Sequence, residues 1–249
     1  MIYSKALGLS IPATRLVGKL QGSAPGPTVV FVAGIHGNEP SGVFALHQLI
    51  REVESHQIRI KGNVYAISGN LGALIEGERY KNQDLNRMWS KESVRELLLR
   101  DVASLEPELR EQRELYDLAT SILKENSGPF YFMDLHTTSS ATVPFLTVND
   151  SLLNRKFTKQ YPLPIVLGIE EYLDGPMLSY INELGYVSFG FEGGQHDDPR
   201  SVQNHLSFAY LSLVYSGSLS LTDFDFKLHH SRLSLQTGEL CPFYEILHR

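Results

Sequence analysis

Short, continuous apolar runs alternate with segments of helical period along most of this 249-residue chain. The first run, Thr28 to Ala33, contains β-branched, aromatic and small residues, as expected of a strand buried on both faces. Comparable runs lie at residues 63–68, 130–135, 144–148, 163–169 and 186–191. Apolar residues recur at helical spacing over residues 40–50, 106–124, 176–184 and 201–215. The alternation predicts an α/β fold with a mostly parallel mixed sheet and helices on both faces.

Two segments depart from this alternation. Residues 69–92 have no clear period and carry several polar side chains, and long irregular loops of this kind are often functional. Beyond Thr222 the pattern loosens into short apolar and polar alternation, which predicts a short β-rich C-terminal tail. We therefore expect a main domain of residues 1–220 and a short C-terminal segment of residues 221–249. The charged face of the helix expected at 106–124 is interpreted as solvated surface.

Charge and cysteine content limit the classes of partner and of metal site. The chain has 22 Lys and Arg against 28 Asp and Glu, and its basic residues are scattered among acids, which argues against a nucleic-acid partner. Cys241 is the single cysteine, so a zinc site with two or more thiolates is excluded and a metal must bind through His, Asp or Glu.

Neither a signal-peptide pattern nor a membrane-spanning apolar run is present. We expect a cytoplasmic protein without membrane contact; its oligomeric state, a homo-oligomer included, stays open.

Three groups of polar residues directly follow predicted strands, where α/β sheets bind their ligands. They are the segments Gly34-Ile35-His36-Gly37-Asn38-Glu39-Pro40, Asp134-Leu135-His136-Thr137-Thr138 and Glu192-Gly193-Gly194. In the first segment, the residue before proline avoids the helical region and two glycines permit an unusual backbone path, so His36 and Glu39 can converge. With His136 they supply two imidazoles and one carboxylate, a set typical of catalytic zinc with an open fourth position. For each histidine alone, a hydrogen-bonded core residue is the alternative interpretation.

Other polar residues form weaker patterns. The loop segment Arg79 to Arg87 contains arginines that can polarise a carbonyl oxygen or clamp a carboxylate, and a solvated charged loop is the alternative. His196 closely follows Glu192 and precedes two aspartates, which makes it a candidate site residue, but a glycine-rich turn explains the same residues at least as well. The remaining histidines lack a comparable setting and are interpreted as structural or surface residues.

Four segments, taken in chain order, resemble the ordered motifs of the succinylglutamate desuccinylase and aspartoacylase family, which is related to the zinc carboxypeptidases. They are Gly34 to Pro40, Arg79-Tyr80 with Asp84-Leu85-Asn86-Arg87, Asp134 to Thr138, and Glu192-Gly193-Gly194-Gln195-His196. The resemblance extends from about residue 28 to about residue 200. It implies that one Zn²⁺ per chain binds to His36, Glu39 and His136. It further implies catalytic roles for Glu192, as general base and then acid, and for Arg79, as stabiliser of the oxyanion. Asn86 and Arg87 would hold the carboxylate of the substrate. Asp84 would orient the loop.

The function implied by the resemblance is zinc-dependent hydrolysis of a linear amide, with removal of an acyl group from a small N-acyl amino acid. One alternative is a zinc carboxypeptidase that acts on short peptides. Another is a non-catalytic zinc-binding or ligand-binding module, although neither Glu192 nor Arg79 is needed merely to hold a metal. Glu170 and Glu171 are rival candidates for the base, but only Glu192 has the Glu-Gly context of the family.

Two departures from the family pattern affect the expected specificity. In aspartoacylase an arginine about ten positions before the catalytic glutamate grips the acyl-side carboxylate; the corresponding position here is Asn182, and Arg155 is the only arginine between His136 and Glu192. This difference weakens the expectation of acyl-aspartate specificity. Family members also carry a longer C-terminal β domain that contributes a tyrosine to the pocket. The resemblance makes residues 221–249 a remnant of that domain, with Tyr244 as the nearest candidate.

Overall fold

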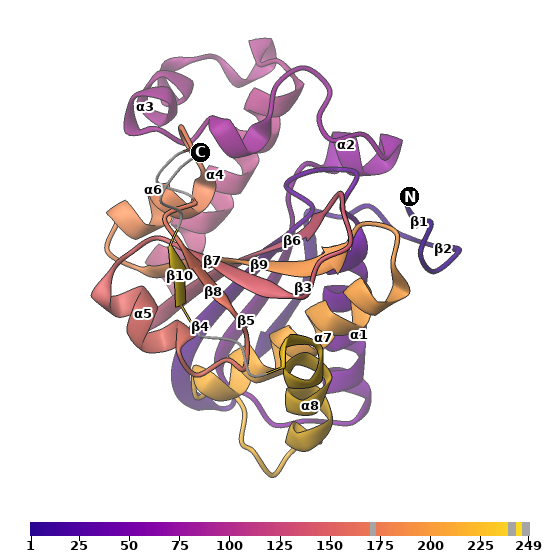
Figure 1. Cartoon of the computed structure of the whole chain (residues 1–249). Coiled ribbons are helices and arrows are strands. Elements are labelled where there is room, and N and C mark those ends of the chain that lie inside the picture. The colour runs from indigo at the N-terminus through magenta and orange to yellow at the C-terminus, as the bar shows by residue number, and fades with distance from the viewer. Residues whose placement is uncertain (170–172, 239–242, 246–249) are drawn as a thin grey trace.

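The apolar runs form the centre of an eight-stranded sheet in the computed structural model, which describes residues 1–169, 173–238 and 243–245 (Figure 1). The strand order is β10-β8-β7-β9-β6-β4-β5-β3. In chain order these strands are β3 (Leu16–Gln21), β4 (Ala24–Ala33), β5 (Lys61–Ser68), β6 (Phe130–Thr138), β7 (Phe145–Val148), β8 (Ile165–Leu167), β9 (Val187–Gln195) and β10 (Phe243–Glu245). The β3–β5 and β7–β9 pairs are antiparallel and the other pairs are parallel, which confirms the mostly parallel mixed sheet. A separate hairpin joins β1 (Ile2–Ser4) to β2 (Leu9–Ile11).

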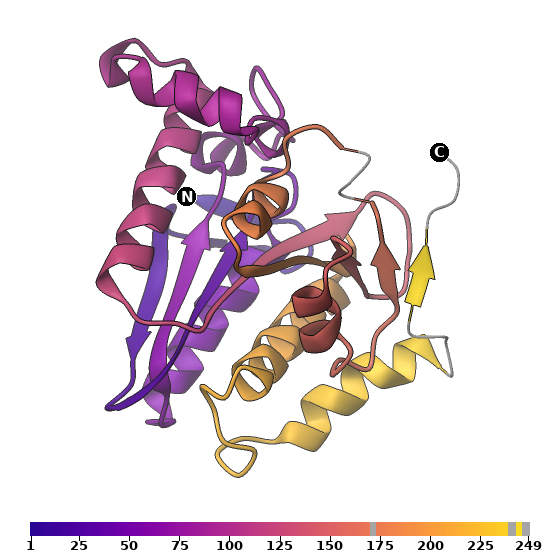
Figure 2. The same cartoon turned by 90° about the vertical axis from the view of Figure 1, so that its left-hand side faces the viewer.

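Helices cover both faces of the sheet, as expected (Figure 2). They are α1 (Ser41–Ser55), α2 (Leu71–Glu76), α3 (Lys91–Leu99), α4 (Pro107–Glu125), α5 (Leu152–Thr158), α6 (Met177–Glu183), α7 (Pro199–Tyr215) and α8 (Phe226–Thr237), with 3-10 turns at Leu85–Arg87 and Val102–Ser104. Because successive strand residues face opposite sides, β4 contributes to two cores. Phe31 joins the core against α1 and α7, whereas Val30 and Val32 join the core against α4 and α6.

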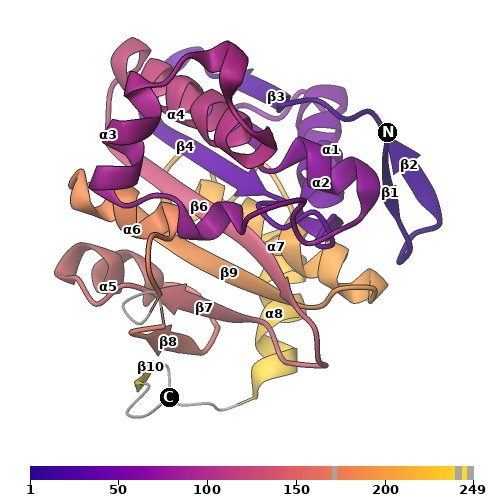
Figure 3. The same ribbon diagram turned by 90° about the horizontal axis from the view of Figure 1, so that it is seen from above.

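Several elements differ from the sequence expectation. Strands β6 and β9 continue to Thr138 and Gln195, so the second and third polar motifs lie within the last residues of their strands rather than after them. The segment 69–92 contains α2, a 3-10 turn and the start of α3, and it lies across the carboxyl end of β4 (Figure 3). The predicted β-rich tail is wrong at residues 226–237, which form α8 and pack against α7. Among the described residues of the tail, β10 is a strand. No helix among the described residues is both long and apolar enough to cross a membrane.

Candidate metal centre and active site

A tight turn after β4 brings His36 and Glu39 together. Gly34 adopts a φ of +71°, a conformation that glycine reaches without strain. The backbone amide of Glu39 then donates to the carbonyl oxygen of His36 over 3.1 Å, and Pro40 precedes the first residue of α1. His36 Nδ1 lies 2.9 Å from Glu39 Oε1 as a result. The pre-proline position therefore holds Glu39 in a turn and not on a helix face, as the sequence predicts.

The second imidazole comes from the neighbouring strand β6, which runs parallel to β4. His136 Nδ1 lies 3.3 Å from Glu39 Oε2, and the backbone amide of Thr137 donates to the same oxygen over 2.8 Å. His36, Glu39 and His136 are all buried, and one ligand atom of each lies within 4.8 Å of the other two. The described residues thus include a group that can hold a metal ion.

The outer nitrogen of each imidazole faces an aspartate. His36 Nε2 lies 3.1 Å from Asp84 Oδ1, and His136 Nε2 lies 2.8 Å from Asp134 Oδ2. Such carboxylates orient a metal-binding imidazole and fix the tautomer that leaves Nδ1 free. Asp134 has no role predicted from the sequence, although its spacing from His136 is informative, because residues two apart on a strand point to the same face.

The charges in this cluster favour a cation at its centre. Burial alone would raise the pKa of Glu39, but hydrogen bonds and charge from the two imidazoles outweigh it and hold that pKa well below its usual range. Burial would also lower the pKa of both histidines, yet the surrounding acids, Asp84 and Glu39 for His36 and chiefly Asp134 for His136, raise it. When the two imidazoles are neutral, as metal binding requires, the carboxylates of Glu39, Asp84 and Asp134 leave a negative charge at the cluster. A divalent cation fits this donor set and this charge.

Arg79 lies beside the cluster at the mouth of the site. Its Nη2 is 3.1 Å from Asp84 Oδ2 and 2.9 Å from His36 Nε2, and its Nη1 is 3.6 Å from Glu39 Oε1. The side chain is 43% exposed, so its guanidinium can reach a bound small molecule as well as the acids. The structure brings this predicted residue to the candidate metal group.

Asn86 and Arg87 follow Asp84 in the 3-10 turn. The Asp84 carboxylate accepts from the backbone amide of Asn86 over 3.0 Å, and Asn86 Oδ1 accepts from the backbone amide of Met177 over 3.0 Å. Asn86 therefore ties the turn to α6 and retains its side-chain NH₂ group as a donor. Arg87 Nη1 donates to the carbonyl oxygen of Asn86 over 2.7 Å. No carboxylate of the described residues forms an ion pair with Arg87.

Glu192 lies on β9, the strand next to β6. In the parallel register of these strands it is aligned with His136. Its Oε2 atom is buried and has no hydrogen-bond partner among the described residues. Burial raises the pKa of Glu192 to about 7, with the imidazole charge of His136 acting against the shift and the negative charge of Glu39 adding to it. This carboxyl can therefore gain or lose a proton near neutral pH.

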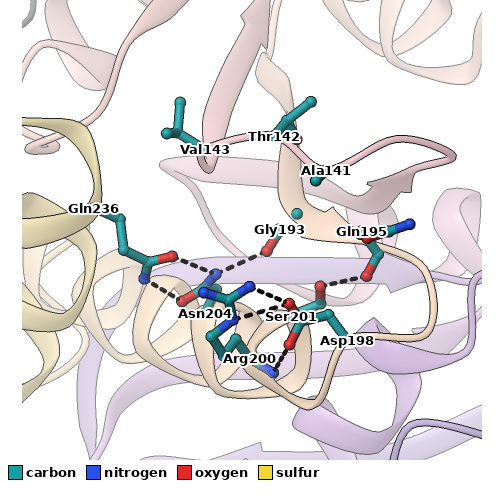
Figure 4. Close-up of a pocket in the computed structure, with 11 residues that line it drawn as sticks. Ala141, Thr142, Val143, Gly193, Gln195, Asp198, Arg200, Ser201, Asn204 and Gln236 are labelled. Atoms are coloured by element: carbon teal, nitrogen blue, oxygen red, sulfur yellow. Dashed lines mark hydrogen bonds and ion pairs between the residues drawn. The ribbon is translucent and has the colours of Figure 1, made fainter.

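Helix α7 fastens the ends of β6 and β9 from the opposite face of the sheet. His205 Nε2 lies 2.9 Å from the carbonyl oxygen of His136, and Asn204 Nδ2 donates to the carbonyl oxygen of Gly193 over 2.8 Å. Gln236 of α8 donates to Asn204 Oδ1 over 2.8 Å (Figure 4). Asn204, Gly193 and Gln236 line a pocket of about 420 Å³ in which these polar groups pair with one another. We interpret them as supports of the two strand ends.

Other residues considered in the sequence lie apart from the metal group. Asn182 sits near the end of α6, where it bonds Asn149, Asn154 and the carbonyl oxygen of Tyr186. Tyr186 directly precedes β9, at the end of that strand that is remote from Glu192. The structure therefore does not support Asn182 as the counterpart of a substrate-binding arginine. Arg155 on α5 is partly exposed and pairs with Asp150. Tyr244 is on the edge strand β10, three strands from β9. Glu170 and Glu171 lie outside the described residues.

Comparison with known proteins places the chain in a family. The family model of the succinylglutamate desuccinylase/aspartoacylase catalytic domain matches residues 25–207. Succinylglutamate desuccinylase of Yersinia enterocolitica is 30% identical over 145 residues, 51% of this chain and 42% of that protein. The enzyme of the same name from Photorhabdus laumondii is 42% identical over 62 residues, 25% of this chain and 19% of that protein. The matches thus span less than half the length of these curated relatives.

A solved structure shows the same fold. The crystal structure of the succinylglutamate desuccinylase from Chromobacterium violaceum superposes with a TM-score of 0.63 at 20% sequence identity, covering 84% of this chain and 67% of that one. The family match includes the turn after β4 and the carboxyl ends of β6 and β9, the parts that form the candidate site. The chain therefore belongs to the succinylglutamate desuccinylase/aspartoacylase family.

Proposed function

We propose that this protein is a zinc-dependent amidohydrolase that removes the acyl group from an N-acyl amino acid. The observation that carries the proposal is the convergence of two imidazole Nδ1 atoms on the carboxylate of Glu39, with a second carboxyl, Glu192, on the adjacent strand. Two imidazoles and a carboxylate form a donor set suited to catalytic zinc, in which a further position stays open for water or substrate.

His36, Glu39 and His136 would hold the metal through the atoms that face one another. Zinc bound there would polarise the scissile carbonyl and favour ionisation of water at neutral pH. Asp84 and Asp134 would keep the imidazoles in the tautomer that presents Nδ1. The chemistry of the donor set supports zinc over calcium or magnesium, which prefer oxygen ligands.

The proton transfers fall to Glu192. Its carboxylate would take a proton from the attacking water and then deliver it to the nitrogen of the leaving amine. A pKa near 7 suits a group that must do both at neutral pH. Arg79 would donate hydrogen bonds to the carbonyl oxygen as negative charge develops on it.

Residues of the 3-10 turn would bind a substrate that has a free carboxylate. Arg87 would pair with the α-carboxylate of the amino acid, and Asn86 would add a hydrogen bond from its NH₂ group. Arg155 and Asn182 lie apart from the metal group, where they bond Asp150 and a network of neighbouring residues, so neither supplies a cation for a carboxylate on the acyl side. We therefore expect neutral or small acyl groups, acetyl among them, to be accepted at least as well as succinyl.

The test is metal analysis of the purified protein followed by a substrate panel. The panel contains N-acetyl and N-succinyl amino acids, their carboxylate-blocked esters or amides, and short peptides. The proposal expects about one zinc per chain and release of free amino acid from acyl amino acids with a free carboxylate. Preferred cleavage of peptides of three or more residues would assign a carboxypeptidase instead. A metal-loaded protein that cleaves none of these compounds would support a non-catalytic binding module.

A further inference from the structure

A buried carboxylate lies on α4, outside the set of residues that the proposed reaction uses. Glu108 belongs to the charged helix face interpreted from the sequence as solvated surface, yet it is only 2% exposed. Its Oε1 accepts from the backbone amide of Lys81 over 2.7 Å, and its Oε2 accepts from the backbone amide of Asn82 over 3.2 Å. Asn70 Nδ2 approaches Oε1 at 3.5 Å.

This arrangement is informative because a buried carboxylate is costly unless it is bonded. No basic side chain of the described residues pairs with Glu108, so its compensation comes from backbone amides of the segment 69–92. Moving Lys81 or Asn82 away would leave the charge of Glu108 without these donors. The carboxylate therefore favours one conformation of the chain at residues 81 and 82.

Those two residues lie between Arg79 and Asp84. Closer to Arg79, the carbonyl oxygen of that residue accepts from the backbone amide of Gly37 over 3.0 Å. A Cβ atom on Gly37 would lie within 2.4 Å of the carbonyl oxygens of Ala73 and Glu78, so glycine permits this close passage of the chain. The backbone next to Arg79 is thus fixed twice, by the metal-ligand turn at the carbonyl group of Arg79 itself and by Glu108 two and three residues further along the chain.

We propose that Glu108 is a positioning residue for Arg79: it holds residues 81 and 82 so that the guanidinium stays beside His36 and Asp84. The inference rests on the proposed function for the role of Arg79, but the contact between Glu108 and the loop can be tested without activity. Glu114 offers a matched control, since it is an acid on the same helix that is half exposed and pairs with Arg15 instead of the loop.

The first test measures amide hydrogen exchange of Lys81 and Asn82 in metal-free protein. Glu108→Gln keeps one acceptor oxygen, and Glu108→Ala removes both. We expect exchange to accelerate roughly 10-fold in the alanine variant and less in the glutamine variant, with no change in Glu114→Gln. Unchanged exchange at both amides in Glu108→Ala would overturn the anchor, whatever reaction the protein catalyses.

The second test is a kinetic double-mutant cycle. Because Arg79 acts on charge that develops in the transition state, Glu108→Gln should lower kcat by roughly 10-fold with little change in KM, while Glu114→Gln keeps the parent values. In an Arg79→Ala background the same Glu108 substitution should cost no more than about twofold. Equal losses in both backgrounds would overturn positioning through Arg79. An inactive parent protein would instead refute the proposed function and leave the exchange test to decide the anchor.

Discussion

Glu192 on β9 is aligned with His136 on β6 in the parallel register of the two strands. Aligned residues of neighbouring strands point to the same face of a sheet, so the carboxyl lies on the face that carries the metal-binding imidazole. The same register aligns Asp134 with Gly190, which places a residue without a side chain beside the aspartate that bonds His136. Pairing of two strands thus sets the relative positions of a candidate metal ligand, its supporting acid and a candidate base.

The first prediction concerns this base. Glu192→Gln preserves the shape of the side chain but cannot accept a proton, so the variant should retain metal and lose turnover by about 10² to 10⁴-fold. Metal content and steady-state kinetics on the best acyl amino acid measure both effects. If Glu192→Gln keeps full turnover while Glu170→Gln or Glu171→Gln loses it, the wrong carboxylate has been assigned.

The second prediction concerns the metal group. His36→Ala and His136→Ala each remove one of three protein ligands, so zinc content should fall from about one per chain to a small fraction, and activity with it. Circular dichroism should still report a folded protein, because the surrounding apolar cores are intact. His56→Ala, which removes an exposed imidazole at the end of α1, is the control. Full zinc occupancy in both variants would reject the site.

The third prediction tests the supporting acids. Asp84→Asn and Asp134→Asn should each weaken zinc affinity by roughly 10-fold to 100-fold, because an amide cannot fix the imidazole tautomer as a carboxylate does. Competition with a chelator measures the affinity. Asp117→Asn, at an exposed ion pair on α4, should leave it unchanged. Equal affinities in all three variants would show that the two aspartates do not act on the metal.

The sequence was sufficient for the features that depend on local pattern. The continuous run at residues 28–33 predicted a strand buried on both faces, and β4 indeed feeds two cores. The pre-proline position of Glu39 predicted the turn in which it meets His36. Both predictions rest on the conformational preference of one short segment, which few tertiary contacts can reverse.

Features that depend on distant partners were not predictable. Glu108 and Gln112 are polar residues on an amphipathic helix, and only the path of a separate loop shows that they are buried against it. Helix α8 has little amphipathic pattern and is held by packing on α7. Asn182 matched an expected spacing from Glu192, but the geometry of α6 places it at the far end of β9.

The fourth prediction concerns the pH dependence of stability. His229 on α8 stacks on Tyr210 and Phe224, and burial together with the nearby charge of Arg232 lowers its pKa to about 4. In the unfolded chain the pKa of histidine is about 6.5, so the unfolded state binds more protons between these values and stability is lost as pH falls from about 6.5 to about 4. From pH 7 to pH 5 this group should cost on the order of 1 kcal/mol.

Urea unfolding at pH 7 and pH 5 measures this effect. In His229→Gln the stability difference between the two pH values should be smaller than in the parent protein, because glutamine does not titrate. The exposed His56→Gln serves as control and should retain the parent difference. A difference that is the same in all three proteins would show that His229 does not carry the pH dependence.

The last prediction concerns the substrate carboxylate. The guanidinium of Arg87 has no acidic partner among the described residues, and it lies three positions from Asp84, which contacts the metal group. If it pairs with the α-carboxylate of the substrate, Arg87→Ala leaves that charge unpaired, at a cost of about 2 to 5 kcal/mol. This cost corresponds to a fall in kcat/KM of roughly 30-fold to several thousand-fold, with the smaller loss expected because Arg87 is only partly buried.

Blocking the carboxylate separates this clamp from a general loss of activity. An acyl amino acid ester or amide should be a poor substrate for the parent protein, and Arg87→Ala should change its kcat/KM little, because the interaction is already absent. Arg113→Ala, which breaks the exposed pair with Asp117 on α4, should affect neither compound. Equal losses on free and blocked substrates would mean that Arg87 supports the fold of the turn. Indifference of the parent protein to blocking would remove Arg87 from the substrate site, because a pocket that binds the carboxylate must discriminate against its ester.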